Sequence, residues 1–216
     1  MIKNTNLNEK ERKFLSYLNS NEEYPLKKDF FKFLLVSSKA SKESIANFFD
    51  GFLVDMLIYS CDNYYLIIYQ NKDKLELENF IEMFNDDMGT RSMIFEGFYI
   101  NKENCTYLQE FLDIIDKEFV FSKMYSNISD LILICNNNRF LLDKLKQIVL
   151  DKYLQDSSFI NLVRTLFKNN LNVSKTANDL YMHRNTLNNK LSSLESDTTL
   201  SIQNFISAVA IYELLK

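Results

Sequence analysis

The chain has few of the residues that long loops and membrane segments need. Its 216 residues include one proline and three glycines, so we expect short polar turns between helices and strands rather than long coil linkers. No stretch approaches 18 uninterrupted apolar residues, and the N-terminal segment MIKNTNLNEKERK lacks the apolar run of a signal peptide. These absences argue against a membrane partner and predict a cytoplasmic protein.

Residues that ligate metals or form disulfides are also scarce. His183 is the single histidine, and Cys61, Cys105 and Cys135 are odd in number and widely spaced in apolar segments. This pattern fits neither a disulfide framework nor a zinc site. We therefore interpret the cysteines as small buried hydrophobes and expect no metal and no cofactor.

Acidic residues outnumber basic ones, and the net charge is −4. The segment from Arg164 to Glu195, however, contains five basic and two acidic residues, so it carries +3 and the rest of the chain −7. A weak positive field on one segment suits contact with nucleic acid, while the acidic remainder avoids it. Because +3 supports few phosphate contacts, we expect two copies of the segment to act together in a homodimer.

Residues 172–194, NVSKTANDLYMHRNTLNNKLSSL, have the pattern of two short helices joined by a tight turn. Asn172 or Ser174 can cap the first helix, whose apolar face has helical spacing. The turn covers 181–183, and the second helix runs from about 184 to 195. This helix is anchored inward by three leucines at helical spacing, Leu187, Leu191 and Leu194.

The arc opposite these leucines carries hydrogen-bonding groups and no acid. Asparagine can pair with adenine, arginine with guanine, and a helix N-terminus favours a phosphate. The segment therefore predicts a recognition helix in the major groove of double-stranded DNA. His183 serves either as the N-cap or as a phosphate contact. The predicted DNA-binding residues are Ser174, Lys175, His183, Arg184, Asn185, Thr186, Asn188, Asn189 and Lys190.

Polar outer faces are also normal for surface helices, so periodicity alone leaves DNA binding open. The TA-x-x-L-Y-x-HRNTL run, from Thr176 to Leu187, makes residues 162–215 resemble the C-terminal helix-turn-helix of PucR/CdaR regulators. The resemblance implies a bacterial transcription regulator without catalytic activity.

The sequence departs from the pattern of these regulators in three places. Leu171 and Thr199 replace usual glycines, and Asn189-Lys190 replaces a common Tyr-Arg pair. Lysine keeps the charge but not the planar fork of arginine, so Lys190 suits a phosphate and not bidentate base recognition.

The N-terminal part alternates between strand and helix patterns. A helix is predicted within 1–24, with Phe14, Leu15 and Leu18 inward and the charged run 9–13 exposed. The order β-α-β-β-α-β with a trailing helix then predicts a ferredoxin-like sheet covered by helices on one side. Its elements are strands at 31–36, 54–59, 64–69 and 93–100 and helices near 45–52, 77–84 and 108–115.

Residues 97–119 make this sheet resemble the degenerate GGDEF-like middle domain of CdaR-type regulators. In active cyclases the hairpin between the second and third strands carries the metal- and nucleotide-binding signature. Here that hairpin reads Ser60-Cys61-Asp62-Asn63-Tyr64, with one carboxylate and no glycine. It cannot hold two metal ions, so the domain is expected to be structural or dimerising. An alternative use of its aromatics, base stacking, rests on Tyr64, Tyr65 and Tyr69.

The predicted fold class is α+β, a ferredoxin-like, GGDEF-like α/β sandwich followed by an all-α helix-turn-helix domain. We expect an N-terminal segment at 1–29, the sheet domain at 30–135, a connecting helix at 136–158 and the helix-turn-helix domain at 159–216. We expect the apolar face of the connecting helix to pack in the core or between the domains rather than to form a dimer interface. The alternative function is a non-catalytic protein-interaction module that has lost DNA affinity. A degenerate nucleotide-binding sensor is the third hypothesis. The patterns leave the effector unknown.

Overall fold

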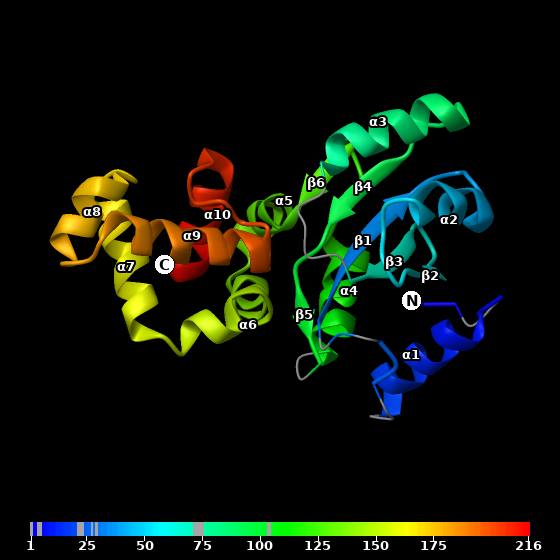
Figure 1. Cartoon of the computed structure of the whole chain (residues 1–216), viewed down its shortest axis with the longest axis horizontal. Coiled ribbons are helices and arrows are strands. Elements are labelled where there is room, and N and C mark those ends of the chain that lie inside the picture. The colour runs from blue at the N-terminus through cyan, green and yellow to red at the C-terminus, as the bar shows by residue number, and fades with distance from the viewer. Residues whose placement is uncertain are drawn as a thin grey trace. The chain divides into compact units, whose positions relative to one another are not determined.

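The computed structural model describes residues 2–3, 6–20, 24–26, 28, 30–70, 76–102 and 105–216. It divides into two compact units, residues 1–127 and 128–216 (Figure 1). The first holds a mixed sheet with helices and the second is all-helical, which confirms the predicted fold class. Residues 128–135, assigned by sequence to the sheet domain, fall within the helical unit. Across the described ranges, no helix is both long and apolar enough to span a membrane.

The first unit contains ten helices and strands among its described residues. They are α1 (Glu9–Ser20), β1 (Phe30–Ser37), α2 (Lys42–Asp50), β2 (Leu57–Ser60), β3 (Tyr65–Tyr69), α3 (Leu77–Met88), β4 (Met93–Glu96), β5 (Ile100–Asn101), α4 (Thr106–Glu118) and β6 (Tyr125–Asn127).

The sheet has the strand order β2-β3-β1-β4-β6, with β5 also paired to β1. All pairings are antiparallel except that of β4 with β6. Strand β1 therefore lies between β3 and β4, which is the arrangement of the predicted β-α-β-β-α-β sheet. Ser41 caps α2 as predicted, because its hydroxyl accepts the Ser44 N–H at 3.1 Å.

Both faces of the sheet are covered, so the prediction of helices on one side was wrong. Alternate residues of β1 point to opposite faces. Leu34 and Val36 share a buried cluster with residues of α2 and α3. On the opposite face, the Phe33 ring lies 5.4 Å from Phe111 of α4, and the Phe31 ring 5.2 Å from Phe14 of α1. The trailing helix and the N-terminal helix thus form a third layer (Figure 1).

Two predicted strands are shorter in the structure. The strand predicted at 93–100 is interrupted at Gly97, whose N–H donates to the Phe33 carbonyl at 2.9 Å. A Cβ at Gly97 would lie 2.4 Å from the Phe33 ring, so only glycine fits here. The strand predicted at 54–59 begins at Leu57, because Asp55 has a left-handed backbone conformation, with φ of 49°.

The hairpin that aligns with the cyclase signature is held by structural contacts. Asp62 forms an ion pair with Lys3 at 3.2 Å, and the Cys61 N–H donates to the Tyr64 carbonyl. Tyr64 and Tyr69 are buried and Tyr65 is half-buried, so these rings belong to the core and form no stacking platform. The three cysteines are buried, as predicted. The described residues contain no cluster of three or more His, Cys, Asp or Glu side chains suited to a metal.

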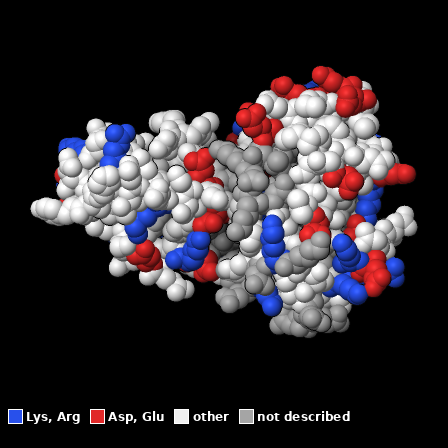
Figure 2. All heavy atoms as spheres, viewed as in Figure 1, with Lys and Arg blue, Asp and Glu red and all other residues white. Residues whose placement is uncertain are grey.

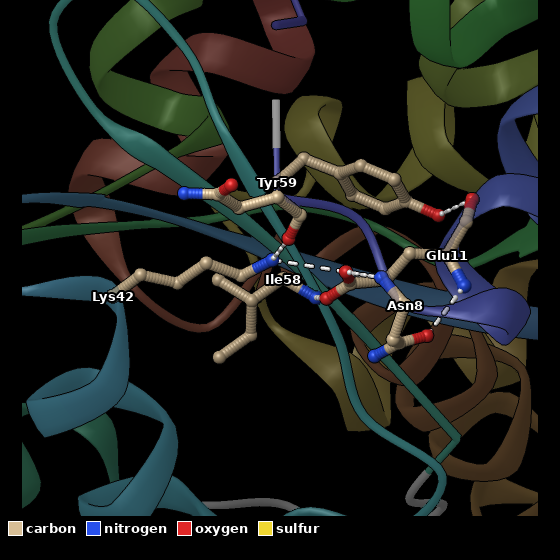
Figure 3. Close-up of polar contacts among 6 residues, drawn as sticks. Asn8, Glu11, Lys42, Ile58 and Tyr59 are labelled. Atoms are coloured by element: carbon tan, nitrogen blue, oxygen red, sulfur yellow. Dashed lines mark hydrogen bonds and ion pairs between the residues drawn. The ribbon is translucent and has the colours of Figure 1, made fainter. Parts of the chain in front are cut away.

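Glu11 is buried, which corrects the prediction of an exposed charged run at 9–13 (Figure 3). Asn8 and Glu11 form a reciprocal capping box, in which each side chain accepts the other's backbone N–H at 2.9 Å. The Glu11 carboxylate also accepts the Ile58 N–H at 3.1 Å and the Lys42 ammonium at 2.9 Å. One carboxylate thus joins α1, the outer strand β2 and α2.

The same N-terminal segment bonds to one edge of the sheet. Strand β2 is one of the two end strands, and its outward Ile58 N–H bonds to Glu11. The Ser60 carbonyl accepts the Lys3 N–H at 2.8 Å. The Tyr59 hydroxyl donates to the Glu11 carbonyl at 2.8 Å, and burial raises its pKa well above the usual value, so it remains a donor. These two backbone contacts cover part of the β2 edge and hinder its pairing with another chain.

The second unit is built from helices around one apolar core. They are α5 (Ile128–Ile134), the short 3₁₀ helix η1 (Cys135–Asn137), α6 (Arg139–Leu154), α7 (Ser157–Lys168), α8 (Val173–Asp179), α9 (Arg184–Thr198) and α10 (Phe205–Leu215). The sequence predicted α6, α8, α9 and α10 but assigned no helix to α5 or α7. Leu145, Leu166 and Ile211 are among its fully buried residues.

Candidate nucleic-acid interface

Helix α8 is fixed at its start by a side-chain cap. The Asn172 side chain accepts the Lys175 N–H at 2.9 Å, so Asn172, not Ser174, is the N-cap. Ser174 and Lys175 lie exposed in the first turn. Because the N–H groups of a first turn carry partial positive charge, an exposed serine and lysine there suit a phosphate.

A buried asparagine braces α8 against the end of α7. The Asn169 side-chain amide donates to Asp179 at 2.8 Å and to Thr176 at 3.3 Å, and Asn169 is 6% exposed. These bonds cross from the end of α7 to the first and last turns of α8. The sequence did not reveal this brace, because asparagine is common throughout the segment and none of its periodicities marks Asn169.

The turn between α8 and α9 is compact. The Met182 N–H donates to the Ala177 carbonyl at 2.9 Å, and Tyr181 adopts a φ of 52°. His183 is the N-cap of α9, since its Nδ1 accepts the Asn185 N–H at 3.2 Å. This bond requires an unprotonated Nδ1 and leaves Nε2 as the nitrogen that can donate to a phosphate. Tyr181, assigned by sequence only to the turn, is 98% exposed at this same end.

Helix α9 is anchored as predicted. Leu187, Leu191 and Leu194 are buried, with exposed fractions of 0%, 4% and 0%. The helix continues to Thr198, three residues beyond the predicted end, and the Thr198 hydroxyl donates to the Leu194 carbonyl at 2.6 Å. The outer side of α9 is therefore presented on a fixed helix.

The predicted contact residues are brought to one end of the unit by α8, the turn and α9. Arg184 has no acidic partner within the described part of the chain. Asn188 and Lys190 are half-buried. The exposed members of the predicted set are Ser174, Lys175, His183, Arg184, Asn185, Thr186 and Asn189.

Lys190 lies beside an acid that the sequence did not place near it. Its ammonium is 3.9 Å from the carboxylate of Asp156, the N-cap of α7. A hydrogen bond from the Ser158 side chain, together with the Phe159 N–H and the charge of Lys190, lowers the pKa of Asp156. At this separation in solvent the pair is weak, so a phosphate can compete for Lys190.

The other end of α9 is tied to α6. Asp197 accepts the Tyr153 hydroxyl and pairs with Lys152. The helix then ends at Thr199, which adopts a φ of 62° and donates its N–H to the Glu195 carbonyl at 2.8 Å. Leu171, in the turn before α8, also has a φ of 62°. Both positions where the resembled family usually has glycine thus have the left-handed backbone that glycine favours.

Charge is sparse on the face of the C-terminal unit that Figure 2 shows. Lysine and arginine side chains are scattered there, with uncharged areas and a few acidic side chains between them. The surface therefore offers isolated cations beside polar amides, which suits a few fixed contacts rather than tight nonspecific binding.

This geometry, two short helices with a tight turn and a second helix that exposes its polar side, defines a helix-turn-helix. Residues 159–216 match the PucR C-terminal helix-turn-helix domain. The second unit therefore contains a helix-turn-helix domain of the PucR type, as its sequence motif predicted.

Comparison with solved structures found a crystal structure of a regulator of polyketide synthase expression from Bifidobacterium adolescentis. The match has 14% sequence identity and a TM-score of 0.47, and it covers 95% of this chain and 91% of that chain. A comparison with curated proteins gave no match.

Proposed function

We propose that this protein regulates transcription by binding duplex DNA, with α9 in the major groove. The observation that carries the proposal is the first turn of α9, where Arg184, Asn185 and Thr186 are all exposed on a helix held by buried leucines. The N-terminal residues of a recognition helix are those that reach base edges.

Most of the predicted side chains have a chemical role in this proposal. Arg184, which has no acidic partner among the residues that the structure describes, can donate two hydrogen bonds to guanine, and Asn185 or Asn189 can pair bidentately with adenine. Ser174 and Lys175 lie at the start of α8 and suit phosphates, as do His183 and Lys190. Asn188, which is half-buried, contributes less than its exposed neighbour Asn189.

The first unit has a supporting role in this proposal and no catalytic one. Its hairpin carboxylate Asp62 pairs with Lys3, and its buried acids Glu11 and Glu96 bond to side chains of the same unit. These acids are engaged in structural contacts, which supports a regulator that acts by binding alone. The +3 segment makes few phosphate contacts, so the binding species is proposed to be a homodimer.

The test is binding of purified protein to fluorescent DNA fragments from its own upstream region at two salt concentrations. Arg184→Ala should weaken specific binding by roughly 5- to 150-fold, because one bidentate base contact is worth about 1–3 kcal/mol. Arg139→Ala, which removes the same charge from an exposed position on α6 outside the +3 segment, is the matched control and should bind like the wild type.

These measurements distinguish DNA binding through α9 from a protein-interaction function. Specific binding that survives Arg184→Ala would refute the assignment of α9. Negligible binding by the wild type at both salt concentrations would instead support a protein-interaction module.

A further inference from the structure

The side chain of Tyr181, in the turn between α8 and α9, is almost entirely outside the fold. It is 98% exposed, more than any other large hydrophobic side chain among the described residues. Within that part of the chain, its ring packs against no other ring and its hydroxyl has no hydrogen-bond partner. The side chain therefore adds little to the stability of the second unit.

The backbone at Tyr181 favours a different residue. Helix α8 ends in a Schellman motif, in which the Tyr181 N–H donates to the Asn178 carbonyl at 3.1 Å and the Met182 N–H to the Ala177 carbonyl at 2.9 Å. This motif needs a left-handed residue at position 181, and Tyr181 has a φ of 52°. Glycine would avoid the steric penalty that the Cβ of tyrosine incurs there.

Two other residues with this backbone conformation show what is unusual about Tyr181. Among the described residues, Leu171, Tyr181 and Thr199 are the only ones with positive φ that are not glycine, asparagine or aspartate. Leu171 and Thr199 are half-buried, so their side chains still pack on the fold. Tyr181 has an unfavourable backbone and no packing to offset it, which marks a candidate functional position.

The surroundings of Tyr181 indicate the kind of ligand. His183 and Arg184, which follow directly, are exposed at the start of α9. The first residues of a recognition helix reach base edges, so a side chain just before them lies nearer the sugar-phosphate backbone. Tyrosine hydroxyls are among the groups that bond to DNA phosphates. Asp179, the acid two residues before Tyr181, is engaged by the Asn169 amide at 2.8 Å.

We propose that the Tyr181 hydroxyl donates a hydrogen bond to a phosphate of the bound DNA, beside the start of α9. The inference rests on the proposed function, because it needs α9 in the major groove. A phosphate contact at this point fixes the register of α9 on the duplex without reading a base. Since the hydroxyl carries no charge, the contact releases no counterion, unlike a lysine contact.

The experiment measures binding of the full chain to fluorescent DNA fragments from its own upstream region at two salt concentrations. Tyr181→Phe removes only the hydroxyl and should raise the dissociation constant about 10-fold at both concentrations, as expected for a hydrogen bond to a charged group. Lys175→Ala removes a cation, so it should also reduce the salt dependence of binding. The two kinds of phosphate contact are thereby distinguished.

Tyr212→Phe is the matched control. It removes the hydroxyl of a tyrosine that is 48% exposed on α10, outside the predicted contact residues, and should bind DNA like the wild type.

Tyr181→Gly tests whether the residue serves binding or the fold. It should raise the midpoint of thermal unfolding by about 2 °C, because glycine fits the left-handed turn, while it weakens DNA binding at least as much as Tyr181→Phe. A residue that supported the fold would lose stability together with its side chain.

Three outcomes would overturn the inference. Wild-type affinity in Tyr181→Phe would refute the hydroxyl contact, and a lower unfolding midpoint in Tyr181→Gly would show that the ring supports the fold. In either case, binding that still depends on Arg184 leaves the proposed function intact. The third outcome, a wild type that binds no DNA fragment, would refute the proposed function itself and the tyrosine contact with it.

Discussion

Glu11 in the first unit and Arg184 in the second both lie in the first turn of a capped helix, yet their surroundings are opposite. Glu11 is buried and bonds to Asn8, Ile58 and Lys42. Arg184 is exposed and has no acidic partner within the described ranges. The first unit uses its charged first turn to hold three elements together, whereas the second leaves its first turn available to a ligand. Residue type and helix position therefore do not by themselves separate a structural charge from a binding one.

The largest expected effect concerns Glu11. Glu11→Ala leaves the Ile58 N–H without its acceptor and the Lys42 ammonium without its carboxylate, so that Lys42 keeps only the Asn6 carbonyl at 3.2 Å. The substitution should lower the free energy of unfolding by about 3 kcal/mol. Urea unfolding measures the loss, and hydrogen exchange at the Ile58 amide should accelerate. Glu9→Ala removes an exposed acid of the same helix that bonds to Lys13, and should leave stability nearly unchanged. Equal stability of the two variants would mean that the Glu11 contacts are dispensable.

An intermediate effect of opposite sign is expected at the end of α9. Thr199 has a left-handed backbone, and its buried hydroxyl has no hydrogen-bond partner. Thr199→Gly should therefore raise the free energy of unfolding by about 1 kcal/mol, since relief of the left-handed penalty exceeds the added flexibility. Thermal unfolding followed by helical circular dichroism would measure the change.

Thr198→Gly is the control for Thr199. The Thr198 hydroxyl donates to Leu194 and accepts the Leu200 N–H at 3.2 Å, so its removal should destabilise the same helix end. A gain in stability from both substitutions would show that chain flexibility, not the left-handed backbone, determines the result.

The smallest effect on stability is expected on the outer arc of α9. Asn185→Ala and Asn189→Ala should each change the free energy of unfolding by less than about 0.5 kcal/mol, because both side chains are exposed. Asn169→Ala is the contrasting variant, since it removes the buried brace to Thr176 and Asp179 and should destabilise the unit. A large loss of stability in Asn185→Ala would mean that Asn185 has a structural role, as Glu11 does, rather than being available to a ligand, as Arg184 is.

The sequence predicted features that arise from neighbours along the chain. The spacing of Leu187, Leu191 and Leu194 is a local signal, and all three are buried as predicted. The caps at Ser41 and His183 are local as well. The strand order followed from the succession of elements, because short connections allow few topologies.

Features that depend on distant partners were not predicted. The tertiary partners of Glu11 lie 31 and 47 residues away. Its one local partner, Asn8, marks the start of a helix and does not reveal that Glu11 is buried while Glu9 is exposed. Position 97 requires glycine because the Phe33 ring occupies the space of a side chain. Lys190 pairs with Asp156 only because α7 folds back toward α9. In each case the deciding neighbour comes from another element.

The contacts of Lys3 and Glu11 with β2 have a consequence for synthesis on the ribosome. Residues 3–11 are translated before residues 57–60, so the groups that cover the outer strand already exist when that strand emerges. Because residues 3–11 can contact β2 as soon as it emerges, the strand has little time to pair with a strand of a neighbouring nascent chain. The order of the sequence thus protects the growing polypeptide on the polysome as well as the finished sheet.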